Sequence, residues 1–282
     1  MPLPNALTIA GFDPSGGAGV LADTRTFASL GYRASAAITS LTFQNDLRAT
    51  GATHQTAATV RSQVKALLEH HQFSCAKTGM LPTLQVVREV ARLFREQNLP
   101  APVVDPVMIS SSGMRLMEEN AQEVFISDML LVARLVTPNI PEAEALSGLV
   151  ITSETVMREA AKIIRGLGAR AVLIKGGHLR EQKAQGSRQK AESSKQRAKG
   201  STKKAGACPD EAIDVLDDDG AVTVFRAEFI PGAVIRGSGC ILSAAIAAGL
   251  GQEKSLAESV REAKDFVLNE LRGAEQSQNR ER

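Results

Sequence analysis

Short apolar segments that alternate with helix-like segments constrain the fold of this 282-residue chain more than any other feature. Helix patterns separate the successive strand patterns, which lie at residues 6–10, 34–40, 75–78, 102–104, 134–136 and 171–175. Such alternation favours a mostly parallel sheet with helices on both faces. We therefore predict an α/β fold of this class.

The loops that follow these strands contain most of the glycine, amide and acidic candidates for a site. Ligands of open α/β sheets bind beyond the carboxyl ends of the strands. We expect the loops to gather at that edge, and they include Gly11, Gln44, Gly79, Asp105, Asn139 and Gly176.

A glycine-rich turn at residues 236–240 precedes a run of small and apolar residues that is typical of a buried helix. The first N–H groups of a helix are unpaired and attract anions. The turn is therefore either an anion site with Cys240 beside it or a tight turn before a core helix. Another glycine sequence, residues 17–22, matches the dinucleotide-binding fingerprint, but it follows its strand too late and no acidic residue ends the next strand.

Two polar side chains near the amino-terminal strands are candidates for substrate recognition. Asp23 lies one turn after Gly19, where it could accept a hydrogen bond from a substrate hydroxyl. Gln44 carries an amide that can match an aminopyrimidine edge with two hydrogen bonds. On spacing alone, a surface glutamine is the simpler interpretation of Gln44.

Polar residues at three later strand ends are candidates for phosphate and metal binding. Asn139 and Glu142 lie at a helix start, where Glu142 could hold Mg²⁺ through water. Ordinary N-capping by Asn139 with an acid in the first turn is the alternative. Asp105 is a second candidate acid, and Lys175 could offer a point charge to phosphate oxygens.

Charge and cysteine content exclude several classes of protein. The net charge of +2 gives no argument for nucleic-acid binding, and no apolar run is long enough to span a membrane. The three cysteines are too scattered for a disulfide framework or a zinc site. We therefore expect a cytoplasmic protein that binds neither nucleic acid nor membrane.

One domain is expected over residues 1–272, interrupted by a basic low-complexity segment at residues 180–211. That segment lacks large apolar residues, so we predict a disordered, solvated insertion; a flap or an anion-attracting tether is the alternative. Residues 212–225 then read as a β-hairpin with an acidic turn, and residues 273–282 as a polar tail.

The order of several motifs resembles that of hydroxymethylpyrimidine/phosphomethylpyrimidine kinases, the thiamine-pathway members of the ribokinase-like superfamily. The matching segments cover the chain from Ala6 to the final helix except the insertion. They include Asp13-Pro14-Ser15-Gly16-Gly17-Ala18-Gly19, Gln44-Asn45, Lys77-Thr78-Gly79-Met80-Leu81, Val104-Asp105-Pro106-Val107-Met108, Thr137-Pro138-Asn139-Ile140-Pro141-Glu142 and Gly237-Ser238-Gly239-Cys240.

The resemblance implies ATP-dependent phosphorylation of hydroxymethylpyrimidine and then of its monophosphate in one site, with ATP and the pyrimidine as partners. It also implies a homodimer. By position, Gln44 would read the pyrimidine edge, and the residues around the ring would be Gly11, Asp23, Met80 and Val107.

For the phosphates, the resemblance implies a magnesium motif at Asn139 and Glu142, with Asp105 as a further acid. Cys240 would be the base, with its pKa lowered toward neutral by the helix start. The ATP phosphates would be contacted by Lys175, Gly237, Ser238 and Gly239.

The chain departs from the family's pattern beside both pockets. Val234-Ile235-Arg236 stands where Asn-Thr-His is usual, and Ile241 replaces a threonine. Phe12 stands where a small polar residue is usual, and Phe43 adds bulk beside Gln44. Two alternatives therefore stay open: a B6-vitamer (pyridoxal-type) kinase of the same fold, and a non-catalytic regulator that binds a pyrimidine or a nucleotide.

Overall fold

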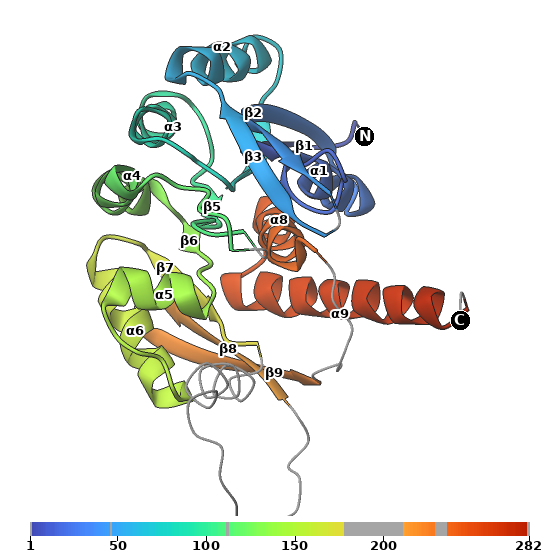
Figure 1. Cartoon of the computed structure of the whole chain (residues 1–282), viewed down its shortest axis with the longest axis vertical. Coiled ribbons are helices and arrows are strands. Elements are labelled where there is room, and N and C mark those ends of the chain that lie inside the picture. Colours follow the sequence, from blue (N-terminus) through green and yellow to red (C-terminus); the bar gives the residue numbers. More distant parts are fainter. Residues whose placement is uncertain (1, 46, 111–112, 178–210, 229–235, 281–282) are drawn as a thin grey trace, which may run out of the picture.

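A nine-stranded, mostly parallel sheet forms the centre of the computed structural model, which describes residues 2–45, 47–110, 113–177, 211–228 and 236–280 (Figure 1). The strand order is β3-β2-β1-β4-β5-β6-β7-β8-β9. Neighbouring strands in the run β2-β1-β4-β5-β6-β7 are parallel. The pairings β2–β3 at one edge, and β7–β8 and β8–β9 at the other, are antiparallel. The predicted α/β class with a mostly parallel sheet is confirmed.

Strands and helices follow one another along most of the chain. The strands are β1 (Asn5–Phe12), β2 (Arg33–Gln44), β3 (Ala49–His54), β4 (Phe73–Thr78), β5 (Val103–Val104), β6 (Leu135–Val136), β7 (Ala171–Lys175), β8 (Glu211–Asp218) and β9 (Ala221–Glu228). The helices are α1 (Gly19–Ser29), α2 (Ala57–Leu68), α3 (Leu84–Glu96), α4 (Glu119–Val124), α5 (Ile140–Ser147), α6 (Glu154–Gly166), α8 (Ser238–Gly251) and α9 (Leu256–Arg280). A π-helical turn, η1 (Phe125–Met129), and a 3₁₀ turn, η2 (Leu130–Val132), follow α4.

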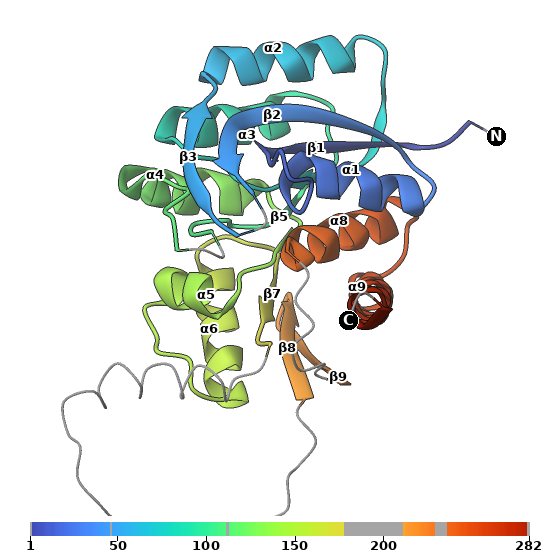
Figure 2. The same cartoon turned by 45° about the vertical axis from the view of Figure 1, so that its right-hand side comes forward.

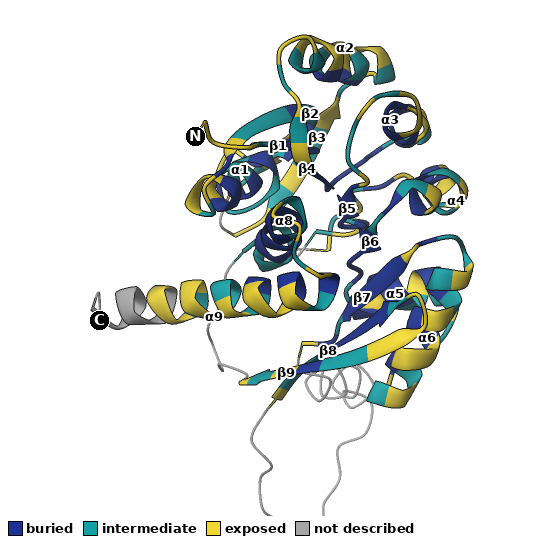
Figure 3. Cartoon of the chain, turned by 180° about the vertical axis from the view of Figure 1, so that it is seen from behind, coloured by how far each residue is buried: buried dark blue, intermediate teal, exposed yellow. Residues whose placement is uncertain are grey.

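Two hydrophobic cores cover the two faces of the sheet. Successive side chains of a strand point to opposite faces, so Leu7 of β1 joins the core under α2 to α6, while its neighbour Ala6 joins the core under α1, α8 and α9. Figure 2 shows these two helical layers on either side of the strands. Figure 3 shows the same burial by colour, with the central strands dark blue and the outer face of α9 yellow.

Helix α8 is held deep in the second layer. Its residues from Ile241 to Gly249 are buried, as expected for a helix that is apolar on all sides. The hydroxyl of Tyr32 donates to the carbonyl of Ala248 at 2.6 Å, which ties the start of β2 to the end of α8. These contacts fix the glycine turn at the start of α8 against the sheet edge.

The β2–β3 hairpin is the main difference from the sequence prediction. Residues 41–50 were expected to form a loop, but β2 continues to Gln44 and pairs with β3, with Phe43 opposite Gly51. Thr42 is buried while Phe43 is exposed, so the segment follows the two-residue period of a strand. Because most of the segment is polar, the alternation of buried and exposed residues could not be seen in the sequence. Gln44 is therefore the last residue of a strand.

The ends of the predicted domain also differ in detail. The insertion lies outside the described residues, except that Glu211 is the first residue of β8. The β8–β9 hairpin is confirmed. Helix α9 continues to Arg280, so residues 273–280 extend a helix and are not a separate tail, because polar residues such as Glu275 and Gln276 form helices readily. Within the described residues, we find no helix with both the length and the apolarity needed to cross a membrane.

Candidate active site

Close backbone packing brings the turn before α8 against the glycine loop after β1. Gly237 has a φ of 72°, and a Cβ there would lie 2.2 Å from the carbonyl oxygen of Gly17. Gly19 has a φ of 60°, and a Cβ there would lie 2.2 Å from the carbonyl oxygen of Gly11. Only glycine fits either position. No described side chain caps the start of α8, so its first N–H groups are open to a ligand.

A cavity opens beyond the carboxyl ends of the strands, as the sequence predicts. Among the predicted substrate residues, Gly11, Gln44, Met80 and Val107 line it. The sulfur of Met80 packs so closely on Gly11 that a Cβ there would lie 3.1 Å from it. Thr39 donates to the carbonyl of Met80 at 2.6 Å, which holds this wall in place.

Asp23 is the predicted substrate residue that the structure does not bring to the cavity wall. Both of its carboxylate oxygens accept hydrogen bonds from Lys77, at 2.9 and 2.8 Å, and Thr8 donates to one of them at 2.6 Å. All three residues are fully buried. The described lining of the cavity includes Lys77 but not Asp23. Asp23 therefore lies one layer behind the cavity and holds Lys77 in place.

The Lys77 ammonium stays charged although it is buried. Burial acts to lower the pKa of Lys77, but attraction from Asp23, Cys240 and Asp105 raises it above its ordinary value. Lys77 was not among the predicted site residues. The sequence does contain a sign of its role: Lys77 interrupts the buried strand pattern at residues 75–78, where an unpaired charge would be costly, so a buried acidic partner could have been expected.

A second lysine–carboxylate pair lies directly on the cavity wall. The Lys175 ammonium donates to Asp105 at 2.8 Å, and Thr137 donates to the same carboxylate oxygen at 3.3 Å. Burial acts to raise the pKa of Asp105, but Lys175 and Lys77 lower it below its usual range. A Cβ on Gly239 would lie 3.1 Å from the Lys175 nitrogen, so the turn before α8 passes over this pair.

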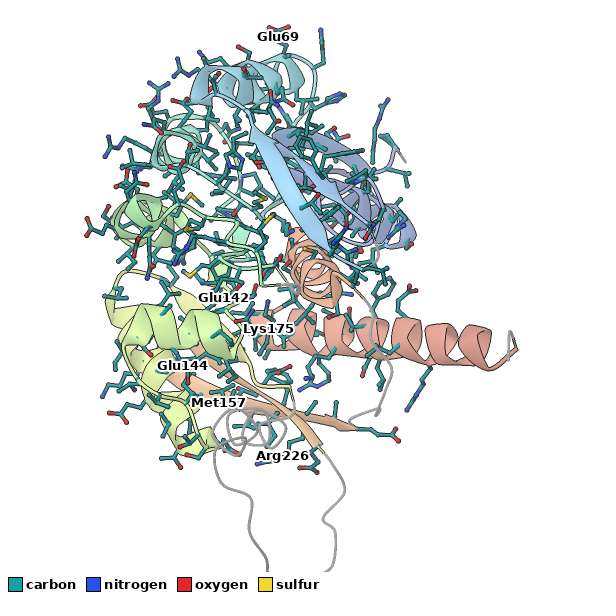
Figure 4. All side chains as sticks on the ribbon, in the orientation of Figure 1. Glu69, Glu142, Glu144, Met157, Lys175 and Arg226 are labelled. Atoms are coloured by element: carbon teal, nitrogen blue, oxygen red, sulfur yellow. The ribbon has the colours of Figure 1, made fainter. Side chains whose placement is uncertain are left out.

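Asn139 and Glu142 form a capping box at the start of α5. The Glu142 N–H donates to the Asn139 side chain at 2.9 Å, and the Asn139 N–H donates to the Glu142 carboxylate at 2.9 Å. Both residues also line the cavity, so the N-cap alternative and the site prediction are compatible. Burial, aided by the charge of Asp105, raises the pKa of Glu142 to about 7 although Lys175 acts to lower it. Figure 4 labels Glu142 in the first turn of α5 and Lys175 at the end of β7, near each other.

The donor set suits a Mg²⁺ that is held partly through water. Asp105 and Glu142 bring two carboxylates to one wall, and electrostatic repulsion between them contributes to the raised pKa of Glu142. Bound magnesium in phosphate sites takes one or two carboxylates and keeps several waters. Within the described residues, no group of three or more histidine, cysteine or acidic side chains forms a metal cluster. Asp105 and Glu142 would therefore fit a Mg²⁺ that keeps several of its waters.

The predicted low pKa of Cys240 is wrong. Cys240 lines the cavity, but burial raises the pKa of its thiol to about 11. Lys77 and the N–H of Gly19 act to lower this pKa, whereas Asp23 and Asp105 act to raise it. The start of α8 does not offset the loss of hydration, so the thiol is neutral at neutral pH.

A second cavity adjoins the first and shares one wall with it. The shared residues include Asn139, Glu142, Lys175, Gly237 and Gly239, whereas Ser238 lines the second cavity. Of the residues predicted to bind the ring, Gly11, Gln44, Met80 and Val107 line the first cavity. Of the predicted phosphate residues, Lys175, Gly237 and Gly239 lie on the shared wall. The start of α8 therefore borders both cavities. Arg236 also lines both cavities; from the sequence it was a departure from the family's pattern and a hypothetical charge for the phosphates.

The family model and the curated relatives agree on one family. Residues 13–281 match the family model described as phosphomethylpyrimidine kinase. The chain is 35% identical over 269 residues to the hydroxymethylpyrimidine/phosphomethylpyrimidine kinase of Aquifex aeolicus, a match that covers 95% of this chain and 94% of the relative.

Solved structures agree with that match. The phosphomethylpyrimidine kinase of Clostridium difficile 630 is similar with a TM-score of 0.75 and 30% identity, covering 95% of this chain and 99% of the other. The pyridoxal kinase of Staphylococcus aureus in complex with ADP is similar with a TM-score of 0.78 and 30% identity, covering 94% of this chain and 87% of the other.

Proposed function

We propose a function for this chain from the premise that it belongs to the phosphomethylpyrimidine kinase family. It transfers the terminal phosphoryl group of ATP to hydroxymethylpyrimidine and then to the resulting monophosphate. The observation that supports this most directly is the pair of adjoining cavities that share Lys175 and the uncapped start of α8. We call the reaction at the alcohol the first transfer and the reaction at the monophosphate the second transfer.

The first cavity holds the pyrimidine ring. The Gln44 amide offers one donor and one acceptor to the amino-nitrogen edge of the ring. Met80 and Val107 provide apolar walls, and the absence of a side chain at Gly11 leaves room for the ring beside the Met80 sulfur. The hydroxymethyl group then points toward the shared wall.

The shared wall binds the phosphates and orients them. Lys175 places a positive charge beside the N–H groups at the start of α8, with Gly237, Ser238 and Gly239 in the first turn. Phosphoryl transfer depends mostly on positioning and on electrostatic stabilisation of the equatorial oxygens. Asn139, Glu142 and Asp105 would hold Mg²⁺, which would neutralise charge on the phosphate oxygens.

Cys240 takes the hydroxyl proton in the first transfer. Its thiol lies at the junction of the ring cavity and the start of α8. Because burial raises the pKa of the thiol to about 11, only a small fraction is thiolate at neutral pH. The adjacent Lys77 ammonium stabilises that thiolate. The rate of the first transfer should therefore rise with pH above neutrality.

A two-substrate kinase assay with mass measurement of the products tests this function. The purified chain, ATP and Mg²⁺ should convert hydroxymethylpyrimidine to its monophosphate and then to its diphosphate. ATP consumption with pyridoxal alone would instead support the B6-vitamer kinase, which the similarity to the Staphylococcus aureus enzyme keeps as the second candidate. Binding of the pyrimidine without ATP consumption would support the non-catalytic regulator. The homodimer and the cytoplasmic location stay predictions, and sedimentation would test the first of them.

A further inference from the structure

Arg236 lies at the boundary between the two cavities and contacts two other loops. It directly precedes the turn at the start of α8, and it lines both the ring cavity and the phosphate cavity. Its guanidinium donates to the carbonyl of Asn45 at the tip of the β2–β3 hairpin. It also lies 3.5 Å from the Asp13 carboxylate in the loop after β1. The side chain thus crosses the cavity where ring and phosphates would meet.

Asp13 does not depend on Arg236 for its hydrogen bonds. The N–H and the hydroxyl of Ser15 donate to one oxygen of Asp13, at 2.9 and 2.7 Å, and the N–H of Ala18 donates to the other at 3.0 Å. The longer contact to Arg236 adds charge attraction only. The guanidinium can therefore turn to another anion while the Asp13 carboxylate keeps its partners.

The charges around the cavity leave Arg236 as the exchangeable cation. Among the described residues that line the ring cavity, the acids are Asp13, Asp105 and Glu142, and the cations are Lys77, Lys175 and Arg236. Lys77 and Lys175 each hold a carboxylate at 2.8 Å. Arg236 alone among these three cations lacks a carboxylate closer than 3.5 Å. A substrate that already carries a phosphate adds negative charge to this set. Arg236, held by the neutral Asn45 carbonyl and the more distant Asp13 carboxylate, is the cation that can turn to meet it.

We propose that Arg236 binds the phosphate of the monophosphate substrate and so selects for the second transfer. This inference rests on the proposed function. A guanidinium matches a phosphate with two parallel N–H donors, which a lysine cannot reproduce. The unphosphorylated alcohol offers no such anion, so it gains little from Arg236.

The two transfers differ in what they require from the protein. In the first, the hydroxyl oxygen bonds to the terminal phosphorus of ATP, the bond from that phosphorus to the bridging oxygen breaks, ADP leaves, and the hydroxyl proton passes to Cys240. In the second, a phosphate oxygen makes the same bond and ADP leaves in the same way. A phosphate monoester loses its second proton near pH 6, so its attacking oxygen carries no proton at neutral pH. The second transfer therefore needs a cation for the dianion and no base.

Separate kinetics for the two transfers test the role of Arg236. In Arg236→Gln, the ratio of kcat/KM for the monophosphate to kcat/KM for the alcohol should fall about 10- to 100-fold, the range for losing a hydrogen bond to a charged group. Arg236→Lys should restore part of the ratio. Arg25→Gln is the matched control. Arg25 donates at 2.5 Å to the carbonyl of Gly16, in the loop after β1 that also contains Asp13, but it is not among the described residues that line either cavity. Its ratio should match that of the wild type.

Calorimetric binding of the monophosphate and of the alcohol without ATP gives a readout that does not need turnover. Arg236→Gln should weaken binding of the monophosphate more than binding of the alcohol, and its thermal unfolding midpoint shows whether the variant is folded. Equal losses for the two substrates, or no loss for either, would overturn the inference. Wild-type protein that phosphorylates the alcohol but not the monophosphate would also overturn it. Wild-type protein inactive on both would overturn the proposed function instead, while calorimetry would still report on Arg236.

Discussion

Two lysine–aspartate pairs near the carboxyl ends of the parallel strands share the same chemistry but have different surroundings. Lys77 and Asp23 are both 0% exposed, and the two oxygens of the Asp23 carboxylate accept hydrogen bonds from Lys77 and Thr8. In the second pair, the Lys175 side chain is 16% exposed and that of Asp105 is 5% exposed, and both line the cavity. Lys77 borders the cavity, but its ammonium is fully buried against Asp23, so this sealed pair is less able than the open pair to exchange its partners for a ligand. Exposure thus separates a supporting pair from one that meets the substrate.

The largest effect should come from breaking the sealed pair. Asp23→Asn leaves the buried Lys77 ammonium without its hydrogen-bonded carboxylate, and removal of one partner from a buried pair costs about 3–5 kcal/mol. That is a large part of the total stability of a typical domain. The free energy of unfolding, measured by urea denaturation with circular dichroism, should fall by this amount.

The open pair and a double variant provide the controls. Asp105→Asn should cost less, because Lys175 keeps the attraction of Glu142 and can reach water in the cavity. Replacing both members of the sealed pair, in Asp23→Leu with Lys77→Met, should recover much of the lost stability. A loss of under about 1 kcal/mol in Asp23→Asn would contradict the assigned role of the sealed pair.

Removing the cation of the open pair should reduce turnover more than stability. Lys175→Met removes the charge beside the start of α8, and loss of one such stabilising group costs about 10²- to 10³-fold in kcat. Both transfers should fall together, since the same ATP phosphoryl group is moved in each. Steady-state kinetics and urea unfolding of the same sample check the two halves of this prediction. Turnover close to that of the wild type would place the ATP phosphates away from Lys175.

Cys240 lies beside both pairs, and its replacement should separate the two transfers. Cys240→Ala should lower the first transfer by about 10²-fold, the lower range for losing a general base. The second transfer should change much less, because the attacking phosphate oxygen carries no proton. This is the reverse of the pattern expected for Arg236→Gln. Equal losses in both transfers would argue that Cys240 positions the substrate and does not act as a base.

The sequence was sufficient to predict which loops meet, but not how deeply each side chain lies. Strand order along the chain placed Gly11, Gln44 and Asp105 at one edge, because carboxyl ends of parallel strands share that edge. The partnership of Lys77 with Asp23 joins residues 54 positions apart, and no periodic pattern encodes it. Because the sequence does not reveal this pairing, Asp23 was predicted to contact the substrate.

The pKa of Cys240 was mispredicted for a related reason. A helix start acts through local backbone groups, which the sequence reveals. Desolvation depends on everything packed around the thiol, including carboxylates from α1 and from the segment after β5. The β2–β3 hairpin was missed because backbone pairing holds the two strands together, and their polar side chains give no apolar alternation that would indicate strands. Local sequence patterns thus predicted most helices and strands, whereas the packing of these elements determined the pKa values of the buried side chains.

The smallest effect should appear in the reactivity of Cys240 when the open pair loses its carboxylate. Asp105 acts to raise the pKa of the Cys240 thiol, so Asp105→Asn should lower that pKa and increase the thiolate fraction. Alkylation by iodoacetamide, followed at Cys240 by peptide mass spectrometry, should be a few-fold faster in the variant, since the thiolate is the reactive form. In both proteins the rate should rise about tenfold per pH unit from pH 7 to 9, because that range lies below a pKa of about 11. Asp128→Asn, which removes a carboxylate paired with Arg95 on the other helical layer, should leave the rate at its wild-type value. A rate already on a plateau near pH 7 would mean that the start of α8 prevails over burial, and Cys240 would then be a thiolate ready to act at neutral pH.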